Sequence, residues 1–393
     1  MKNKLVVLAF AFCILIGFTF CNGKHSNLSE QTDKKSDTII SLNKNQNSNE
    51  VVANKKFNDI AHFISGIDVD STGKYFTLTQ TLAWKSYKKE SSELWIRFEN
   101  KKNIICKWAD KEGISKLSDS IKTVFYPFSG PDFLFADLFF PHANKYILIG
   151  LEKTGRIPMP DTIKKENMHT VLNSYKIAIN DIMCLSFFKT NDMKKELASE
   201  AVDGAVPVLM MFLTRAGKDI VSITPMKLNS DGNLVPVEKN DTAKLKKSIV
   251  EIIFKDRDNQ QQKSLIYISA DLADYALNKN KSFNKFLQSQ NKSMITFLKS
   301  ATYLMHKSYF SMIRSIILRQ SNVVLQDDSG ISYNFFPKET WEMSYYGTYT
   351  DPINMFKDYF QPKLLDDFKL HAKPLPFRIG YNSISNLMLA VKK

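Results

Sequence analysis

The sequence lacks the short motifs that mark the common nucleotide, metal and hydrolase sites. It has no GxGxxG or P-loop glycine pattern, no GxSxG turn, no HExxH helix and no EF-hand acidic loop. Cysteine is scarce, with four in 393 residues, and no CxxC pair or Cys/His spacing suits zinc. We therefore expect neither a bound cofactor nor a metal ion. Cys106 and Cys184 could pair in an oxidising compartment or remain two ordinary buried thiols.

Acidic residues are also in short supply. The chain has 40 Asp and Glu against 54 Lys and Arg, which gives a formal charge of +14. Such a surface could face anionic lipid headgroups or an acidic glycan, or could simply serve solubility. The sequence argues against nucleic acid as a partner, because the aromatic residues lie in apolar runs rather than among a strip of Lys and Arg.

The amino terminus carries the pattern of an exported protein. Lys2 and Lys4 precede an apolar run at 5–20 that is too short for a comfortable membrane span, and Cys21 follows directly. The arrangement resembles the start of bacterial lipoproteins, and the resemblance implies cleavage before Cys21 and a lipid anchor, such as palmitate, on that cysteine. A soluble secreted protein or an uncleaved anchor are the alternatives, because residues 18–20 read FTF where a small residue normally precedes the cut.

Composition divides the rest of the chain. We expect a signal peptide at 1–20 and a flexible tether at 21–56, since that polar tract cannot bury enough apolar surface to offset its ordering entropy. Residues 57–393 form the folded body, as one unit or as two lobes, 57–215 and 216–393. The expected location is the cell envelope, on its periplasmic or outer-surface face, with the membrane as a partner through the lipid. The sequence identifies no protein partner.

The body is expected to assemble around residues 125–151. Eight of these 27 residues are aromatic, more than double the chain-wide 12%. The pattern predicts a strand at 122–128, a loop at 129–131, a compact helix to Phe140 and a second strand at 145–151. This is a βαβ unit. The predicted fold class is α/β, a mixed sheet with flanking helices that includes a Rossmann-like arrangement as one possibility.

Periodicity assigns the remaining segments. Amphipathic helices are predicted within 57–110 and 168–216, and strands at 219–228, 248–255 and 263–270, the last two as a hairpin. Two further helices are predicted at about 294–305 and 309–320. A strand ending at Gln326, a strand at about 341–349, and a last apolar run at 387–391 complete the chain.

A candidate binding site follows the first strand of the βαβ unit. Ser129 and Gly130 lie where a strand gives way to a helix, and free N–H groups at a helix amino terminus can hold an anion. Glu152 comes at the end of the second strand, where many nucleotide-binding folds place an acid that binds ribose. The alternative is structural: Ser129 and Asp132 have the spacing of a helix capping box.

Candidate catalytic acids are Asp132, Asp327 and Asp328, with His306 as a partner. One of these acids could act as a general base or general acid beside His306. The alternative for Asp327 and Asp328 is a plain turn, because Asp-Asp-Ser-Gly is ordinary turn composition and adjacent carboxylates on an extended chain point to opposite sides. Asp137 lies in a helix without an obvious polar face, so we expect a structural hydrogen bond or a shifted pKa there.

Three segments, PFSGPDFLFADLFFP, LQDDSGISYNFF and KPLPFRIGY, are similar to those of a group of bacterial exported proteins to which no activity is assigned. The resemblance therefore supplies no site residues. From the sequence we expect a cell-envelope lipoprotein that binds a partner or an anionic envelope component such as a glycan or lipid. The alternative is an envelope hydrolase that uses one of the candidate aspartates.

Overall fold

A computed structural model describes residues 52–188, 196–197, 202–238, 248–290, 293–381 and 384–393. The predicted signal peptide, most of the predicted tether and Cys21 lie outside the described residues. The helices are α1 (Lys55–Ile64), α2 (Phe76–Thr79), α3 (Leu82–Lys111), α4 (Leu117–Ser120), α5 (Phe133–Phe139), α6 (Met168–Leu185), α8 (Ala205–Arg215), α9 (Asp274–Lys279), α10 (Lys281–Ser289), α11 (Ser311–Gln320) and α12 (Pro362–His371). The strands are β1 (Thr123–Tyr126), β2 (Lys145–Gly150), β3 (Lys218–Leu228), β4 (Leu234–Pro236), β5 (Ile249–Asp256), β6 (Gln262–Ser269), β7 (Met294–Leu298), β8 (Ser321–Gln326), β9 (Trp341–Gly347) and β10 (Asn386–Lys392).

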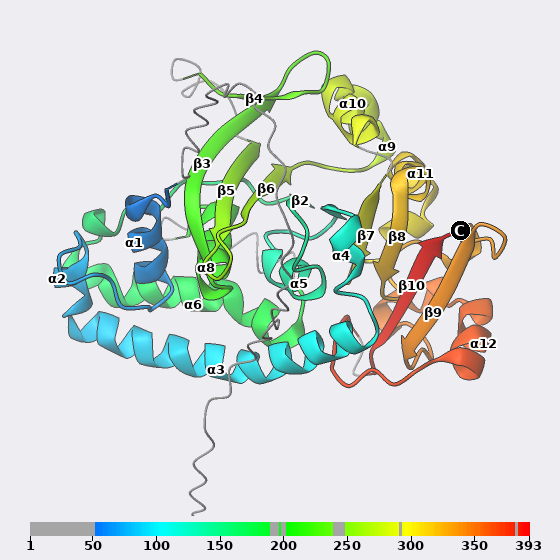
Figure 1. The fold of residues 1–393 in the computed structure, drawn as a ribbon, viewed down its shortest axis with the longest axis horizontal. Coiled ribbons are helices and arrows are strands. Elements are labelled where there is room, and N and C mark those ends of the chain that lie inside the picture. Colours follow the sequence, from blue (N-terminus) through cyan, green and yellow to red (C-terminus); the bar gives the residue numbers. More distant parts are fainter. Residues whose placement is uncertain (1–51, 189–195, 198–201, 239–247, 291–292, 382–383) are drawn as a thin grey trace, which may run out of the picture. The chain divides into compact units, whose positions relative to one another are not determined.

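The described strands form one mixed sheet of ten, in the order β4-β3-β5-β6-β2-β1-β7-β8-β10-β9 (Figure 1). Its centre, β6-β2-β1-β7-β8, is parallel throughout. The flanking strands β3, β4 and β5 on one side and β9 and β10 on the other pair antiparallel. Residues 57–215 and residues 216–393 both contribute strands to this sheet. The predicted α/β class, with a mixed sheet and flanking helices, is confirmed.

The central βαβ unit is also confirmed. β1 and β2 pair in parallel, with Val124 opposite Tyr146, and α5 connects them. Parallel strands buried on both faces read as continuous apolar runs, which is what the sequence has here. The hairpin predicted from the two β-branched runs is present as the antiparallel pair β5 and β6.

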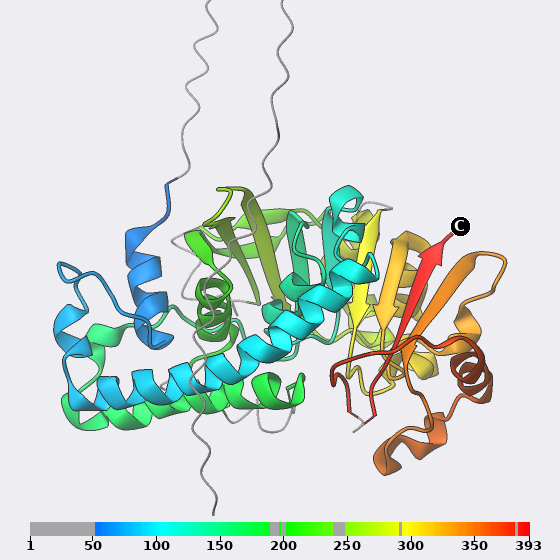
Figure 2. The same ribbon diagram turned by 60° about the horizontal axis from the view of Figure 1, so that its bottom comes forward.

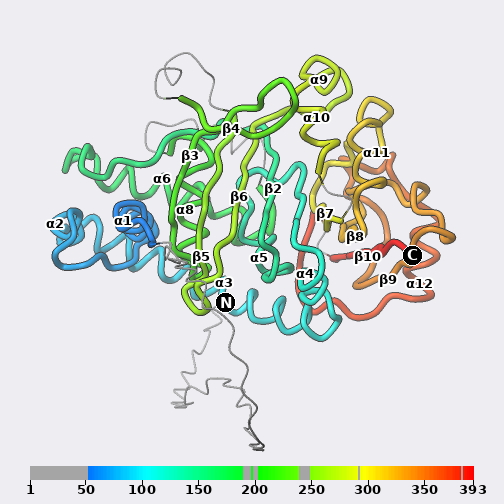
Figure 3. The backbone as a smooth tube through the Cα atoms, turned by 45° about the horizontal axis from the view of Figure 1, so that its top comes forward, coloured from blue at the N-terminus to red at the C-terminus, as the bar shows by residue number. Residues whose placement is uncertain are grey.

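Helices cover both faces of the sheet because side chains alternate between two cores. Along β2, Tyr146 and Leu148 belong to a core with α1, α3, α5, α6 and α8, whereas Ile147 and Ile149 belong to a core with α9, α10, α11 and α12. Figure 2 shows α3 and α6 side by side on the first face. The chain can be followed in Figure 3 from β6 through α9 and α10 to β7. Among the described helices, none has the length and apolar composition needed to cross a membrane.

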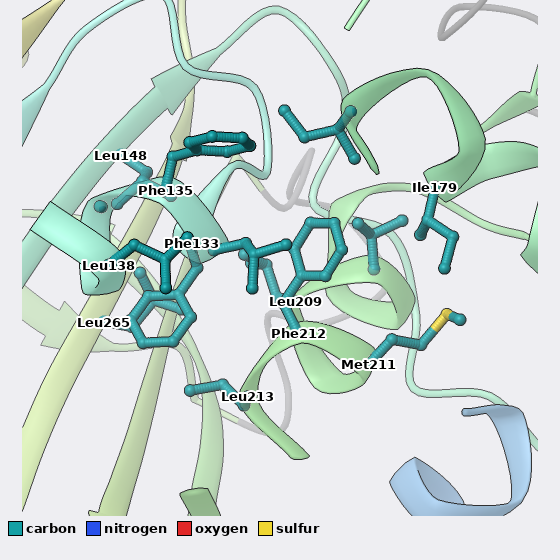
Figure 4. Packing of buried hydrophobic residues seen from close by; sticks show 14 of the residues in the cluster. Phe133, Phe135, Leu138, Leu148, Ile179, Leu209, Met211, Phe212, Leu213 and Leu265 are labelled. Carbon is teal, nitrogen blue, oxygen red and sulfur yellow. The ribbon is translucent and has the colours of Figure 1, made fainter. Parts of the chain in front are cut away.

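The helices of the first core form two layers, an inner layer of α5 and α8 and an outer layer of α3 and α6. All seven residues of α5 and ten of the eleven in α8 are buried, because α3 and α6 lie outside them. Figure 4 shows Phe133 and Phe135 of α5 facing Leu209 and Phe212 of α8. The rings of Phe133 and Tyr146 meet edge to face at 5.1 Å, so α5 is fixed directly on β2.

One predicted helix is wrong. Residues 294–305 are not helical: Met294–Leu298 is β7, an interior strand between β1 and β8, and a short 3-10 turn follows at Leu304–His306. All five residues of β7 are buried. In a short strand that is buried on both faces, apolar and polar residues do not alternate. The sequence pattern therefore cannot distinguish such a strand from a buried helix.

Asn58 of α1 completes the hydrogen bonding of β3. Its side-chain oxygen accepts from the Ile220 N–H at 2.8 Å, and its side-chain nitrogen donates to the Ile220 carbonyl at 2.9 Å. The register of β3 against β5 shifts between Ile220 and Ser222, where a bulge interrupts the ladder. The amide therefore substitutes for a neighbouring strand at this point.

Candidate functional site

The connections that follow β1 and β7 run to opposite sides of the sheet. From β1 the chain passes through α5 to β2, on one side, whereas from β7 it passes through α11 to β8, on the other. In open α/β sheets the loops separate at such a point and leave a crevice at the carboxyl ends of the strands, where ligands bind. The loops after β6, β2, β1 and β7 all leave this edge.

A cavity of about 290 Å³ lies at this edge, and we call it the carboxyl-edge cavity. Its walls are mostly apolar, with a few charged and hydroxyl-bearing side chains among them. The lining residues are Tyr126, Phe128, Ser129, Gly130, Ile149, Gly150, Leu151, Glu152, Phe187, Phe188, Ala270, Asp271, Leu272, Lys299, Ser300, Thr302, Leu304, Phe310 and Tyr381.

A buried ion pair connects the loop after β1 to the residue that follows β7. Lys299, the residue after β7, has its Nζ 2.7 Å from Oδ2 of Asp132, and both side chains are 2% exposed or less. The Tyr126 hydroxyl donates to the same carboxylate oxygen at 2.9 Å, and Oδ1 accepts from the N–H of Phe135 at 3.1 Å. Lys299 also donates to the carbonyl of Ser186 and lies 4.5 Å from the centre of the Phe135 ring. Asp132 thus joins β1, α5 and β7.

The loop after β7 has an unusual backbone. Ser300, Thr302 and Tyr303 all have positive φ, between 51° and 54°, and Phe128 on the facing loop has a φ of 60°. Residues with a Cβ rarely adopt a positive φ. This backbone conformation persists only where surrounding contacts hold it, often at ligand sites. Ser300, Thr302 and Phe128 all line the cavity, and the buried Ser300 Oγ has no hydrogen-bond partner among the described residues.

Asp327 holds this loop in place. Its Oδ2 accepts from the N–H of Ser300 at 2.7 Å, and its Oδ1 accepts from the N–H and hydroxyl of Ser329 at 3.0 and 2.5 Å. Burial and the neighbouring Asp328 charge raise the pKa of Asp327 to about 7. Asp328 points elsewhere, accepting from the Tyr303 hydroxyl and from the Asn386 amide, and burial raises its pKa too.

Two glycines let the loops after β1 and β2 meet. A Cβ on Gly150 would lie 2.7 Å from Cα of Gly130 and 2.5 Å from Oε2 of Glu152. The Glu152 side chain could move away, but the Gly130 backbone could not, so Gly150 is required for this close approach of the two loops. The Tyr267 hydroxyl lies 2.9 Å from the carbonyl and 3.3 Å from Oε2 of Glu152, so Glu152 is fixed beside the cavity.

Asp271, in the loop after β6, is a further acidic residue at the cavity. Its Oδ1 accepts from the N–H of Ala273 at 2.9 Å, and its Oδ2 accepts from the hydroxyl of Tyr275. Both donors are neutral, so they fix the carboxylate without compensating its charge. The side chain is half-buried and lines the cavity.

The structure gathers most of the sequence-predicted site residues at this edge. Ser129, Gly130 and Glu152 line the cavity together. Asp132 lies behind Lys299, and Asp327 lies beneath Ser300. The expected capping box is wrong, because the cap of α5 is Asp132 itself and Ser129 donates instead to the carbonyls of Gly130 and Ile149.

His306 is not brought to the cavity lining. Its ring packs against Tyr303 and Tyr359, with ring centres 5.2 and 5.5 Å away, and its buried Nε2 has no partner among the described residues. Burial and the positive charge of Arg314 lower the pKa of His306 to about 4. A neutral, apolar-packed imidazole is its state near neutral pH.

Among the cavity residues that the sequence does not predict are Asp271, Lys299 and Ser300. The predicted helix at about 294–305 contains Lys299 and Ser300, so the sequence pattern gives no reason to expect that they follow a strand. A sign was present in the letters MITFLKS, where an apolar run of strand length ends at a lysine and a serine. Asp271 follows the correctly predicted end of β6, so the rule that applies to Glu152 applied to it as well.

The remaining predicted polar residues have structural partners. Asp137 accepts from Lys218 Nζ at 3.2 Å and from the Tyr146 hydroxyl at 3.4 Å, and burial raises its pKa. Cys106 and Cys184 are both free thiols, on α3 and α6.

Comparison with known proteins finds no family model that matches this chain and no curated protein that matches it significantly.

Proposed function

We propose that this protein is a cell-envelope lipoprotein whose α/β body binds a small molecule, about the size of one substituted ring, in the carboxyl-edge cavity. The observation that carries the proposal is the pair Lys299 and Ser300. A buried ammonium and a buried hydroxyl, on consecutive residues, both line a mainly apolar cavity at the carboxyl edge of the sheet, the position where ligands bind in open α/β sheets.

The chemistry of the lining supports a binding site. Small-molecule sites are mostly apolar, with a few fixed polar groups that orient the ligand. Here Phe128 and Phe310 meet edge to face at 5.9 Å and form one apolar wall, while Ser129, Glu152 and Lys299 are each fixed by their own hydrogen bonds. Polar groups that are already fixed lose little entropy on binding.

The surroundings of the acids favour binding over hydrolysis. Asp132, Asp327 and Asp328 each accept hydrogen bonds from side chains or backbone N–H groups of the chain itself. These bonds tie the loops after β1, β7 and β8 together. A general base needs a lone pair directed at its substrate, so this arrangement suits a structural role better.

Anchoring completes the proposal. The apolar run before Cys21 and the polar tract after it support a lipid on Cys21, with the body held near the membrane. The ligand would then be an envelope component, and the donors of Lys299 and Ser300 suit one with a carboxylate or carbonyl group.

The test compares the wild-type full chain with Ala270→Trp, which fills the cavity from its lining. Binding of 4-methylbenzoate, 4-methylbenzylamine and 4-(aminomethyl)benzoate is measured by saturation-transfer NMR. Ala372→Trp, at a half-buried alanine outside the cavity, is the matched control, and Leu304→Trp is a second blocking variant if Ala270→Trp does not fold. We expect binding to the wild type and the control but not to the blocked variant. The proposal fails if none of the compounds binds, or if the blocked variants bind them as the wild type does.

A further inference from the structure

We propose that the carboxyl-edge cavity selects a two-ended ligand, with a cationic amine beside Asp271 and a carboxylate or carbonyl beside Lys299 and Ser300. This inference rests on the proposed function and adds the chemical class of the ligand.

The spacing of the strands separates the two ends. Asp271 follows β6 and Lys299 follows β7, and the sheet order β6-β2-β1-β7 places β2 and β1 between them. Neighbouring strands lie about 4.8 Å apart, so the strands of Asp271 and Lys299 are about 14 Å apart at this edge. A ligand that reaches both ends therefore lies along the edge of the sheet, across the ends of β2 and β1.

The Lys299 end offers hydrogen-bond donors. A lysine ammonium has three N–H groups, and two of those on Lys299 are used by Asp132 and by the carbonyl of Ser186. Among the described residues, no hydrogen-bond partner takes the third N–H or the Ser300 hydroxyl, so both remain for a ligand oxygen. Asp132 already balances the Lys299 charge, so a neutral carbonyl suits this end as well as a carboxylate does.

The Asp271 end offers negative charge. The Asp271 carboxylate accepts only from the neutral groups of Ala273 and Tyr275 among its described partners, so its charge is not balanced there. An ammonium group brought to this end gains a charge-assisted hydrogen bond in a partly buried place. Between the ends, Phe128 and Phe310 provide an apolar wall for the body of the ligand.

Calorimetric titration of the full chain with three compounds tests the inference. The compound 4-(aminomethyl)benzoate carries both end groups, 4-methylbenzoate lacks the amine, and 4-methylbenzylamine lacks the carboxylate. We expect the two-ended compound to bind at least about tenfold more tightly than either one-ended compound, since a hydrogen bond to a charged group contributes that much or more.

Two variants test which residue binds each end of the ligand. Asp271→Asn keeps an oxygen for the Ala273 N–H and removes the charge, so it should weaken 4-(aminomethyl)benzoate about tenfold and leave 4-methylbenzoate unchanged. Ser300→Ala should weaken both benzoates and leave 4-methylbenzylamine unchanged. Asp231→Asn, at an exposed acid away from the cavity, is the control and should change nothing.

The outcomes separate this inference from the proposed function. If one-ended compounds bind as tightly as 4-(aminomethyl)benzoate, or if Asp271→Asn has no effect, while Ala270→Trp still abolishes binding, the two-ended ligand is wrong and the binding site stands. If Ala270→Trp has no effect, both are wrong.

Discussion

Asp132 and Lys299 form a buried ion pair, 2.7 Å from Oδ2 to Nζ, between the end of β1 and the end of β7. The two residues are far apart in the sequence, and they meet because β7 inserts beside β1 in the sheet. The pair fixes the relative positions of the two loops that face each other across the carboxyl-edge cavity. Breaking it should therefore affect both stability and the cavity.

Lys299→Met should lower the free energy of unfolding by about 3–5 kcal/mol, because it leaves the Asp132 carboxylate buried without its cation. The control is Lys102→Met, which breaks the surface pair with Glu99, where the two side chains are 34% and 51% exposed. That change should cost less than about 1 kcal/mol. Urea unfolding of the full chain measures both values, and equal losses in the two variants would contradict a buried pair.

Stability should depend on pH through Asp327. Its pKa is raised from 3.8 to about 7 by burial, so between these values the folded protein holds a proton that the unfolded chain releases. Its contribution to stability is therefore present at low pH and is lost as pH rises toward 7, by at most about 1.4 kcal/mol per pH unit. Measured from pH 4.5 to 7.5, the wild type should gain stability relative to Asp327→Asn as pH falls.

His306 acts in the opposite direction, so the comparison with Asp327→Asn is needed to isolate the aspartate. The pKa of His306 is lowered to about 4, and its contribution is lost as pH falls from 6.5 toward 4. If the stability of the wild type relative to Asp327→Asn stays constant from pH 4.5 to 7.5, Asp327 is ionised throughout this range in the folded protein and the prediction is wrong.

Asn58→Leu should destabilise the fold, because the Ile220 N–H loses its partner and the Ile220 carbonyl keeps only the N–H of Asn54. Each buried backbone group left unsatisfied costs about 1–3 kcal/mol. Asn100→Leu, at an exposed position of α3, should change stability by no more than about 0.5 kcal/mol. Thermal unfolding of the two variants checks the prediction, which is wrong if Asn58→Leu behaves like the control.

The lipid anchor can be tested by metabolic labelling with an alkyne analogue of palmitate. Cys21→Ser should abolish incorporation of the label, because the thiol is the proposed site of attachment. Cys13→Ser, within the apolar run, should retain it. Label retained in Cys21→Ser would rule out this anchor.

The sequence predicts the core of this fold well where its patterns are unambiguous. The run 125–151 predicts β1, α5 and β2 because glycine and proline separate its apolar segments, and the β5–β6 hairpin follows from two β-branched runs around a turn. β7 was missed because MITFL is short and buried on both faces, so it carries no period. Without β7, the strand order at the centre of the sheet could not be predicted. The crevice between β1 and β7 could not be predicted either.

The site was therefore only partly predictable. Ser129, Gly130 and Glu152 were found because they follow predicted strands, and the structure places them on one cavity. The role of Asp132 required its partner, which is 167 positions away in the chain. Contacts of this kind depend on strand order, which local patterns do not encode.

The most direct test of the binding site is a crystal structure of the full chain with 4-(aminomethyl)benzoate. The account predicts that the compound lies across the ends of β2 and β1, with its carboxylate at Lys299 and Ser300 and its amine at Asp271. A compound bound elsewhere on the protein, with the carboxyl-edge cavity unchanged, would contradict it.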